Sequence, residues 1–336
     1  MINNEMEINN EMEKLIDSFP TDLKAALNIP TPIPGAQKDF NNIVFIGMGG
    51  SGIGAILIKN WFKDEIKLPI LICQDYSLPE FVNEKTLVVA CSYSGNTEET
   101  LSAVQEAHNK KAVIHGITSG GSLAKFCGDN FYSYLLVPAG FPPRTQLAYM
   151  SVLLTKVLIA HNLVSTSVLN SLSFAYTTLM KEQDTFKQEG RKIAEIIHNK
   201  RVIIYTDSKN EALAIRGKQQ FQENAKLLCS HHVIPEMNHN ELVGWAGGSS
   251  DIAVLFLKTK TMHKQNEKRF SFTHKIVSTY TDTVYTLESE VTDPIISAMQ
   301  MIHVLDWASF YSAELRNVDV IEVTVIDSLK KHLLIE

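Results

Sequence analysis

The sequence predicts an α/β protein of two similar domains, each a mostly parallel sheet flanked by helices. Three observations support this prediction. The chain of 336 residues is long enough for two domains. Short runs of Val, Ile and Leu alternate with helical patterns, which is typical of strands that are buried on both faces of a parallel sheet. The alternation stops at a long helical stretch and then starts again.

The first half of the chain opens with a helical pattern over residues 1 to about 28. The segment "IPTPIPG" follows, in which Pro30, Pro32 and Pro34 each remove a backbone donor and predict an extended connection. Strands are then expected at five apolar runs: "IVFIG" (43–47), "PILIC" (69–73), "TLVVAC" (86–91), "AVIHGI" (112–117) and "YLLV" (134–137).

The second half follows a long helical stretch from about Thr145 to Ile197. Strands are expected at "RVIIY" (201–205), "HHVIP" (231–235), "IAVLFL" (252–257) and "TVYTL" (283–287), and helices at about 294–315 and 322–334. The expected domains are an N-terminal helical segment (1–35), a first domain (36–165), a connecting helix (166–198) and a second domain (199–336).

Composition argues against several classes of protein. The net charge is −6 and no basic block stands out, so we expect no nucleic-acid partner. No apolar run approaches the roughly 20 residues of a membrane span. The N-terminus, "MINNEMEINNEMEK", is acidic and polar, unlike a signal peptide. Four scattered cysteines without a CxxC pair favour reduced thiols and a cytoplasmic protein.

The two halves differ where a ligand would bind. "NIVFIGMGGSGIGA" in the first half corresponds to "RVIIYTDSKNEALA" in the second, and the glycines are missing from the second. We therefore expect both halves to fold alike and only the first to hold a phosphate-type ligand.

The first glycine loop allows two interpretations. Gly47, Gly49 and Gly52 fit the GxGxxG pattern of dinucleotide-binding folds, and Asp75 lies near the end of the next strand, where a ribose-binding acid belongs. The alternative is a tight turn between a strand and a helix.

The stretch "CSYSGNTEET" follows the third strand and is more informative. Ser92, Ser94 and Thr97 supply three hydroxyl groups at a helix start, and Gly95 allows the backbone to approach an oxyanion. Capping of the helix by Ser94 or Asn96 explains one hydroxyl group but not three. The loop therefore predicts a site for a terminal phosphate.

Together with Ser51 after Gly49 and Gly50, this loop resembles the sugar isomerase (SIS) family of phosphosugar-binding domains. Three further segments are similar to the bifunctional phosphoglucose/phosphomannose isomerases within that family, from about residue 40 to the end: "FPPRTQLAYM" with Arg144, "EMNHNELVGW" with Glu241, and "IDSLKKHL" with Lys330.

The resemblance implies two SIS-like domains and an isomerase that interconverts glucose 6-phosphate, and mannose 6-phosphate as well, with fructose 6-phosphate through an enediolate. It implies no cofactor and no metal. The implied substrate-binding residues are Gly50, Ser51, Ser92, Ser94 and Thr97. Glu241 is the implied base, Arg144 the group that stabilises the enediolate, and Lys330 the group that reaches the ring oxygen or a sugar hydroxyl.

Ring opening calls for a histidine that titrates near neutral pH. The resemblance implies His263, in "MHKQNEKRF", which in the family reaches the active site of the neighbouring subunit and so implies a homodimer. His239 and His274 are the alternatives, as Glu236 is for the base and Lys331 for the lysine. Thr324 is a candidate for the residue that makes room for the mannose epimer.

Two other functions and a metal site compete with this interpretation. A non-catalytic SIS regulator would use the same loops, and a dehydrogenase would use the GxGxxG glycines. The segment "HHVIPEMNHNE" contains five side chains that could bind a metal: His231, His232, Glu236, His239 and Glu241. Their spacing fits no helical HExxH arrangement. Each proposed site residue could also have no role in catalysis. Glu241 could be a surface glutamate and Arg144 a surface arginine paired with an acid. Lys330 could be a surface lysine of an amphipathic helix, and His263 an exposed histidine.

Overall fold

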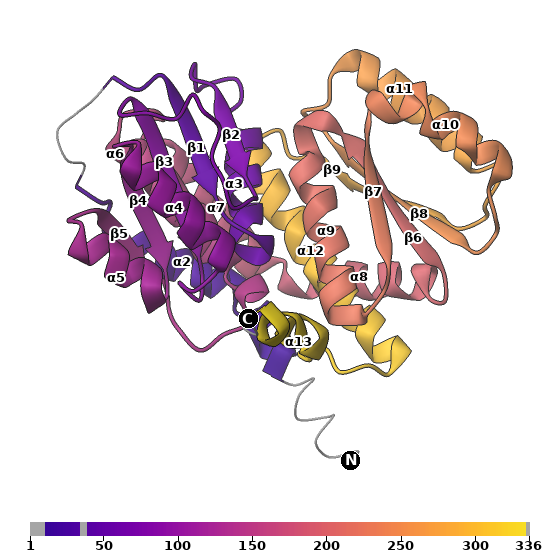
Figure 1. The fold of residues 1–336 in the computed structure, drawn as a ribbon. Helices are drawn as coiled ribbons and strands as arrows, with labels where there is room; N and C mark the ends of the chain where they lie inside the picture. Colours follow the sequence, from indigo (N-terminus) through magenta and orange to yellow (C-terminus); the bar gives the residue numbers. More distant parts are fainter. Residues whose placement is uncertain (1–10, 34–38, 334–336) are drawn as a thin grey trace. The chain divides into compact units, whose positions relative to one another are not determined.

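The computed structural model describes residues 11–33 and 39–333 (Figure 1). The described chain divides into two compact units. The N-terminal unit comprises residues 18–33, 39–181 and 293–296, and the C-terminal unit comprises 11–17, 182–292 and 297–333. The predicted helix over residues 1–10, the proline at 34 and the last residue of the predicted terminal helix lie outside the described residues.

The N-terminal unit contains a five-stranded parallel sheet in the order β2-β1-β3-β4-β5. Its strands are β1 (Asn42–Ile46), β2 (Ile70–Cys73), β3 (Thr86–Ser92), β4 (Val113–Thr118) and β5 (Ser133–Leu136). Its helices are α2 (Phe19–Asn28), α3 (Gly49–Trp61), α4 (Glu98–Asn109), α5 (Gly121–Asp129), η1 (Pro143–Thr145), α6 (Leu147–Ala160) and α7 (Val168–Lys181).

Helices cover both faces of this sheet, which explains the continuous apolar strands. On one face, Val88 and Ala90 of β3 pack with Val104 of α4 and Leu123 of α5 in one buried cluster, and α4 lies in front of the sheet in Figure 1. Helices α3 and α6 pack so closely that a Cβ atom on Gly54 would lie 3.2 Å from the side chain of Leu154 and 3.3 Å from that of Met150 in α6. A fully buried strand must be apolar on both sides.

The C-terminal unit contains a four-stranded parallel sheet in the order β7-β6-β8-β9. Its strands are β6 (Arg201–Asp207), β7 (Cys229–Ile234), β8 (Ile252–Thr259) and β9 (Val284–Ser289). Its helices are α8 (Gln183–Ile197), η2 (Ser208–Asn210), α9 (Glu211–Ala225), η3 (Glu236–His239), α10 (Glu241–Gly244), η4 (Trp245–Gly247), α11 (Lys264–Val277), most of α12 (Pro294–Arg316) and α13 (Thr324–Leu333).

The second sheet is also covered on both faces. Trp245 of η4 and Phe270 of α11 join Phe256 of β8 in a buried cluster on one face. The helices on the other face are linked by a buried ion pair. Nε and Nη2 of Arg216 in α9 donate to the two carboxylate oxygens of Asp306 in α12, at 3.0 and 2.7 Å.

The predicted fold class is confirmed. Each of the apolar runs forms a strand within one or two residues of its predicted bounds, and the order β7-β6-β8-β9 repeats the order β2-β1-β3-β4. The stretch from Thr145 to Ile197 is divided into α6, α7 and α8, and the boundary between the units falls between α7 and α8. None of the helices in the described part of the chain combines the length and hydropathy of a membrane span.

Candidate active site

The predicted phosphate loops lie at the point where the strand order of the N-terminal sheet reverses. In an open sheet of order 2-1-3-4-5, this point lies between β1 and β3, and ligands bind outside the carboxyl ends of the strands there. Residues 47–52 follow β1 and residues 92–97 follow β3, and the two strands pair in parallel. The topology therefore brings both loops to one edge of the sheet.

The loop after β1 is shaped by close backbone contacts. A Cβ atom on Gly52 would lie 2.4 Å from the carbonyl oxygen of Gly47, so only glycine fits there. A Cβ atom on Gly50 would lie 3.1 Å from the backbone nitrogen of Arg144. The structure thus places Arg144, whose side chain is buried, directly beside the first turn of α3.

The hydroxyl groups of the loop after β3 have distinct environments. Ser92 is fully buried, and its Oγ lies 2.8 Å from Oγ1 of Thr97. Ser94 is exposed, and its Oγ accepts a bond from the N–H of Asn96 at 3.2 Å. The Oγ of Ser51 accepts from the N–H of Tyr93 at 3.0 Å. These two acceptor bonds leave the hydroxyl protons of Ser51 and Ser94 available to a ligand.

Helix α4 adds backbone donors to this edge. It begins at Glu98 after Thr97, whose side chain makes no capping bond. The first N–H groups of a helix have no partner within it, and they carry the positive end of the helix dipole. A helix start between two hydroxyl-bearing turns is suited to a phosphate.

A third loop, which follows β4, supports the serine-threonine loop from behind. The hydroxyl group of Ser119 donates to the carbonyl of Tyr93 at 2.6 Å, and the N–H of Ser122 donates to Oδ1 of Asn96 at 3.0 Å. A Cβ atom on Gly95, whose φ is +69°, would lie 1.9 Å from the carbonyl oxygen of Gly120. This support was not predicted from the sequence, although "TSGGS" at a strand end is a signal of the same kind.

Glu241 lies in the C-terminal unit, with its carboxylate held at both oxygens. The hydroxyl group of Tyr205 donates to Oε1, and Nδ1 of His232 lies 2.6 Å from Oε2. Nε1 of Trp245 donates to the Tyr205 hydroxyl oxygen at 3.0 Å. Burial, followed by the Glu241 carboxylate, raises the pKa of Tyr205 far above its ordinary value, so the phenol stays protonated.

The alternative base Glu236 and two histidines of the same segment have separate partners. Glu236 is exposed, and its carboxylate accepts a bond from the side chain of Asn240. His231 lies 3.7 Å from Glu211 of α9, whereas His232 turns to the other face of β7. Within residues 11–33 and 39–333, no three His, Cys, Asp or Glu side chains are grouped as metal ligands.

The remaining predicted residues also lie in the C-terminal unit. His263 is exposed just after β8, where its Nδ1 accepts a bond from the N–H of Gln265 and so caps α11. Lys330 is exposed on α13 and pairs with Asp327 at 3.5 Å. His274 packs its ring against Phe256, with the centroids 5.1 Å apart.

The structure brings together the predicted loop residues and Arg144 in the N-terminal unit. Glu241, His263 and Lys330 belong to the C-terminal unit, together with the alternatives His239, Lys331 and Thr324, all three exposed. Three neighbours of Glu241 were not predicted as site residues: Tyr205, His232 and Trp245. The pair His231-His232 near the start of β7 was the only sequence signal, and it indicated only His232.

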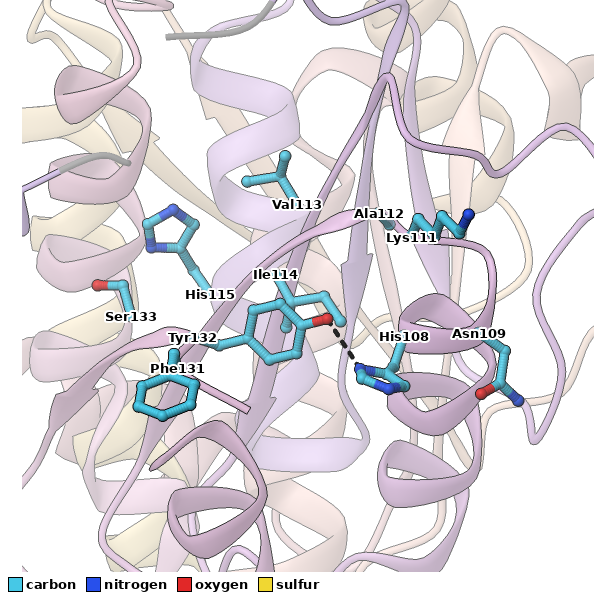
Figure 2. A pocket seen from close by; sticks show the side chains of 10 residues that line it. All are labelled: His108, Asn109, Lys111, Ala112, Val113, Ile114, His115, Phe131, Tyr132 and Ser133. Carbon is cyan, nitrogen blue, oxygen red and sulfur yellow. Dashed lines mark hydrogen bonds between the residues drawn. The ribbon is translucent and has the colours of Figure 1, made fainter. Parts of the chain in front are cut away.

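One cavity lies away from the predicted site residues, and a smaller one is lined by one of them. A cavity of about 610 Å³ lies at the amino ends of β4 and β5, away from the phosphate loops, with His108 facing the hydroxyl group of Tyr132 in its wall (Figure 2). A cavity of about 210 Å³ is lined by Glu241, Tyr205 and Trp245. The smaller cavity is the more relevant one, because the predicted base Glu241 is among the residues that line it.

Two family models match the chain. One is described as "Bacterial phospho-glucose isomerase C-terminal SIS domain" and matches residues 186–333. The other is described as "SIS domain" and matches residues 38–153.

Curated relatives match over most of their length. A protein of Thermoplasma volcanium named bifunctional phosphoglucose/phosphomannose isomerase is 34% identical, over 88% of this chain and 92% of its own. A protein of Caldicellulosiruptor bescii with the same name is 33% identical, over 96% of this chain and 98% of its own.

Solved structures share the fold. The C-terminal domain of glucosamine-fructose-6-phosphate aminotransferase from Francisella tularensis superposes with a TM-score of 0.74, covering 93% of this chain and 98% of its own. The sequence identity is 15%, so this likeness bears on the fold alone.

Proposed function

The chain belongs to the bifunctional phosphoglucose/phosphomannose isomerase family and is an isomerase of the intramolecular oxidoreductase class, and we propose that it interconverts glucose 6-phosphate and mannose 6-phosphate with fructose 6-phosphate. The observation that carries the proposal is the similarity to relatives of that name along both units. A cytoplasmic location is part of the proposal and suits the four buried free cysteines.

The substrate phosphate is proposed to bind at the carboxyl edge of β1 and β3. The support is the pair of loops at the strand-order reversal, with the hydroxyl groups of Ser51, Ser94 and Thr97 and the N–H groups that begin α4. Gly50 lets the backbone of Arg144 lie against the first loop, and Ser92 holds Thr97 by their mutual hydrogen bond. Gly50 and Ser92 are part of the proposed phosphate site.

Glu241 is proposed to transfer the proton. Its carboxylate removes the proton from C2 of the open aldose, and the electrons form the C1–C2 double bond of an enediolate whose charge rests on O1. The same carboxyl group returns the proton to C1, while the proton on O2 passes to O1 and leaves a ketone at C2. A carboxylate that is one-third exposed beside a cavity is suited to general base catalysis.

Three cationic or titratable residues complete the proposal. Arg144 stabilises the negative charge of the enediolate, since its guanidinium is always protonated. Lys330 contacts the ring oxygen or a sugar hydroxyl. His263 opens the sugar ring in the neighbouring subunit of a homodimer, and its exposed position after β8 leaves it accessible to a partner.

The test is an assay with glucose 6-phosphate and mannose 6-phosphate in the presence of a chelator and without added nucleotide. Formation of fructose 6-phosphate from both substrates supports the proposal. A protein that binds hexose phosphates without converting them would be a phosphosugar-binding regulator. Nicotinamide fluorescence on titration with NAD(H) would instead indicate the dehydrogenase interpretation of Gly47, Gly49 and Gly52.

A further inference from the structure

We propose, on the basis of the function above, that His232 and Tyr205 are positioning residues that hold the Glu241 carboxylate in the orientation needed for proton transfer. Neither residue contacts the reacting carbon in this proposal. Both act through Glu241, and the hydrogen bonds that they donate fix which lone pairs of the carboxylate remain open to substrate.

The backbone around Glu241 gives this side chain little support of its own. Glu241 begins the four-residue helix α10, none of whose residues is buried. Its N–H group is bonded to the side chain of Asn240 at 2.5 Å, and Asn240 is exposed. A general base works only when it is held close to its productive geometry. The rigid support therefore has to come from the sheet beneath the helix.

The sheet supplies that support from two adjacent strands. Tyr205 of β6 and His232 of β7 are direct partners in the parallel register. Tyr205 is fully buried and belongs to the apolar cluster under α11, so its hydroxyl group has a fixed position. The two side chains contact opposite oxygens of one carboxylate, which restricts rotation of the carboxylate as well as its translation.

The direction of each hydrogen bond follows from the chemistry of the donors. The indole N–H of Trp245 can only donate, so the Tyr205 oxygen accepts from it and the Tyr205 proton is directed to Glu241. A carboxylate can only accept, so Nδ1 of His232 carries the proton in this hydrogen bond. These bonds use two of about four lone-pair positions on Glu241 and leave the others for the substrate proton.

The orientation of His231 provides a matched control. His231 is adjacent to His232 in the same strand, but it faces α9 and lies 3.7 Å from Glu211. Replacing either histidine removes the same ring from the same strand. Only the replacement of His232 removes a donor to Glu241.

The experiment measures kcat, KM and thermal stability for His232→Leu, His232→Asn, Tyr205→Phe and His231→Leu, with fructose 6-phosphate as substrate. We expect kcat to fall about 10- to 100-fold in His232→Leu and in Tyr205→Phe, with KM within about twofold of the wild type, because the phosphate site is intact. The amide of His232→Asn can donate from nearly the same place as Nδ1, so this variant recovers most of kcat. His231→Leu keeps the wild-type kcat.

Three results would overturn the inference: a wild-type kcat in His232→Leu, an Asn variant as impaired as the Leu variant, or an effect confined to KM. If His232→Leu does not fold, the comparison of Tyr205→Phe with the wild type decides, since that change removes one oxygen atom. A wild-type protein without isomerase activity, or a fully active Glu241→Gln, would defeat the proposed function rather than the positioning roles.

Discussion

The hydroxyl oxygen of Ser51 accepts a hydrogen bond of 3.0 Å from the backbone N–H of Tyr93. This bond joins the first turn of α3 to the loop that follows β3, so the two parts of the proposed phosphate site form one structure. The Tyr93 hydroxyl group also donates to the carbonyl of Pro138 and accepts from the N–H of Phe141, both at 2.9 Å. These two residues belong to the segment between β5 and Arg144. A substitution that distorts one of these loops is therefore expected to shift the others as well.

Gly95→Ala is expected to weaken binding of fructose 6-phosphate by at least about tenfold, or about 1.4 kcal/mol. The new Cβ atom would lie 1.9 Å from the carbonyl oxygen of Gly120, and the φ of +69° is unfavourable for alanine. Isothermal titration measures the change. Gly128→Ala in α5 is the control, since nothing lies within 4 Å of its Cβ position. Equal affinities of the two variants would disprove the role of the loop.

Lys330→Ala is expected to lower kcat about 100-fold, whereas Lys331→Ala leaves it nearly unchanged. The two lysines are adjacent on the exposed helix α13, so their effects on stability should be alike. Steady-state kinetics on both variants therefore separates a catalytic lysine from a surface lysine. If only Lys331→Ala is impaired, the assignment belongs to Lys331.

The contribution of the buried pair His115 and His161 to the stability of the N-terminal unit is expected to fall as the pH is lowered from about 6.5 to about 4. Nε2 of His115 lies 2.8 Å from Nε2 of His161. Burial, followed by His161, lowers the pKa of His115 to about 4, and burial also lowers the pKa of His161. In this window the unfolded chain binds protons that the folded chain does not, which costs up to about 1.4 kcal/mol per pH unit for each histidine.

The measurement for this pair is the unfolding midpoint of the wild type and of His115→Gln across that pH range. The variant should show a shallower loss of stability, because glutamine does not titrate. Buried His303 in the C-terminal unit, whose pKa is also lowered, leaves both proteins with some pH dependence. Equal slopes for the two proteins would contradict the prediction.

Arg216→Met is expected to destabilise the protein by about 3–5 kcal/mol, since it leaves the buried carboxylate of Asp306 without its partner. The double variant Arg216→Met/Asp306→Leu should recover part of this loss. The exposed pair Arg201–Asp251, at 2.9 Å, is the control, and Asp251→Asn should cost less than about 1 kcal/mol. Chemical denaturation provides all of these values, and equal costs at the two pairs would refute the expectation.

The fold could be predicted from the sequence because each strand is buried on both faces. Runs such as "TLVVAC" are apolar throughout, and β3 is buried at every position. The break between α6 and α7 could not be predicted, because residues 145–181 contain no proline or glycine that would end a helix. The turn depends instead on Asn162, which adopts a positive φ of 56°.

The phosphate loops were predictable because their chemistry is local. Ser92, Ser94 and Thr97 lie within six residues and follow a strand, so their proximity needs no tertiary information. The support of Glu241 was not predictable in the same way. Tyr205 is 36 residues away in sequence, and it meets Glu241 only because β6 and β7 are neighbours in the sheet.

The central claim is that Glu241 moves a proton between C2 and C1. The most direct test is conversion of fructose 6-phosphate in deuterium oxide, with the glucose 6-phosphate and mannose 6-phosphate products analysed by proton NMR for deuterium at C2. We predict that the wild type incorporates solvent deuterium at C2 and that Glu241→Gln converts the substrate about 10²- to 10⁴-fold more slowly while still binding it. Conversion by Glu241→Gln at the wild-type rate would contradict the claim. So would wild-type products that still carry no deuterium at C2 after many reversible turnovers, because a proton held on a carboxyl group that is one-third exposed exchanges with solvent.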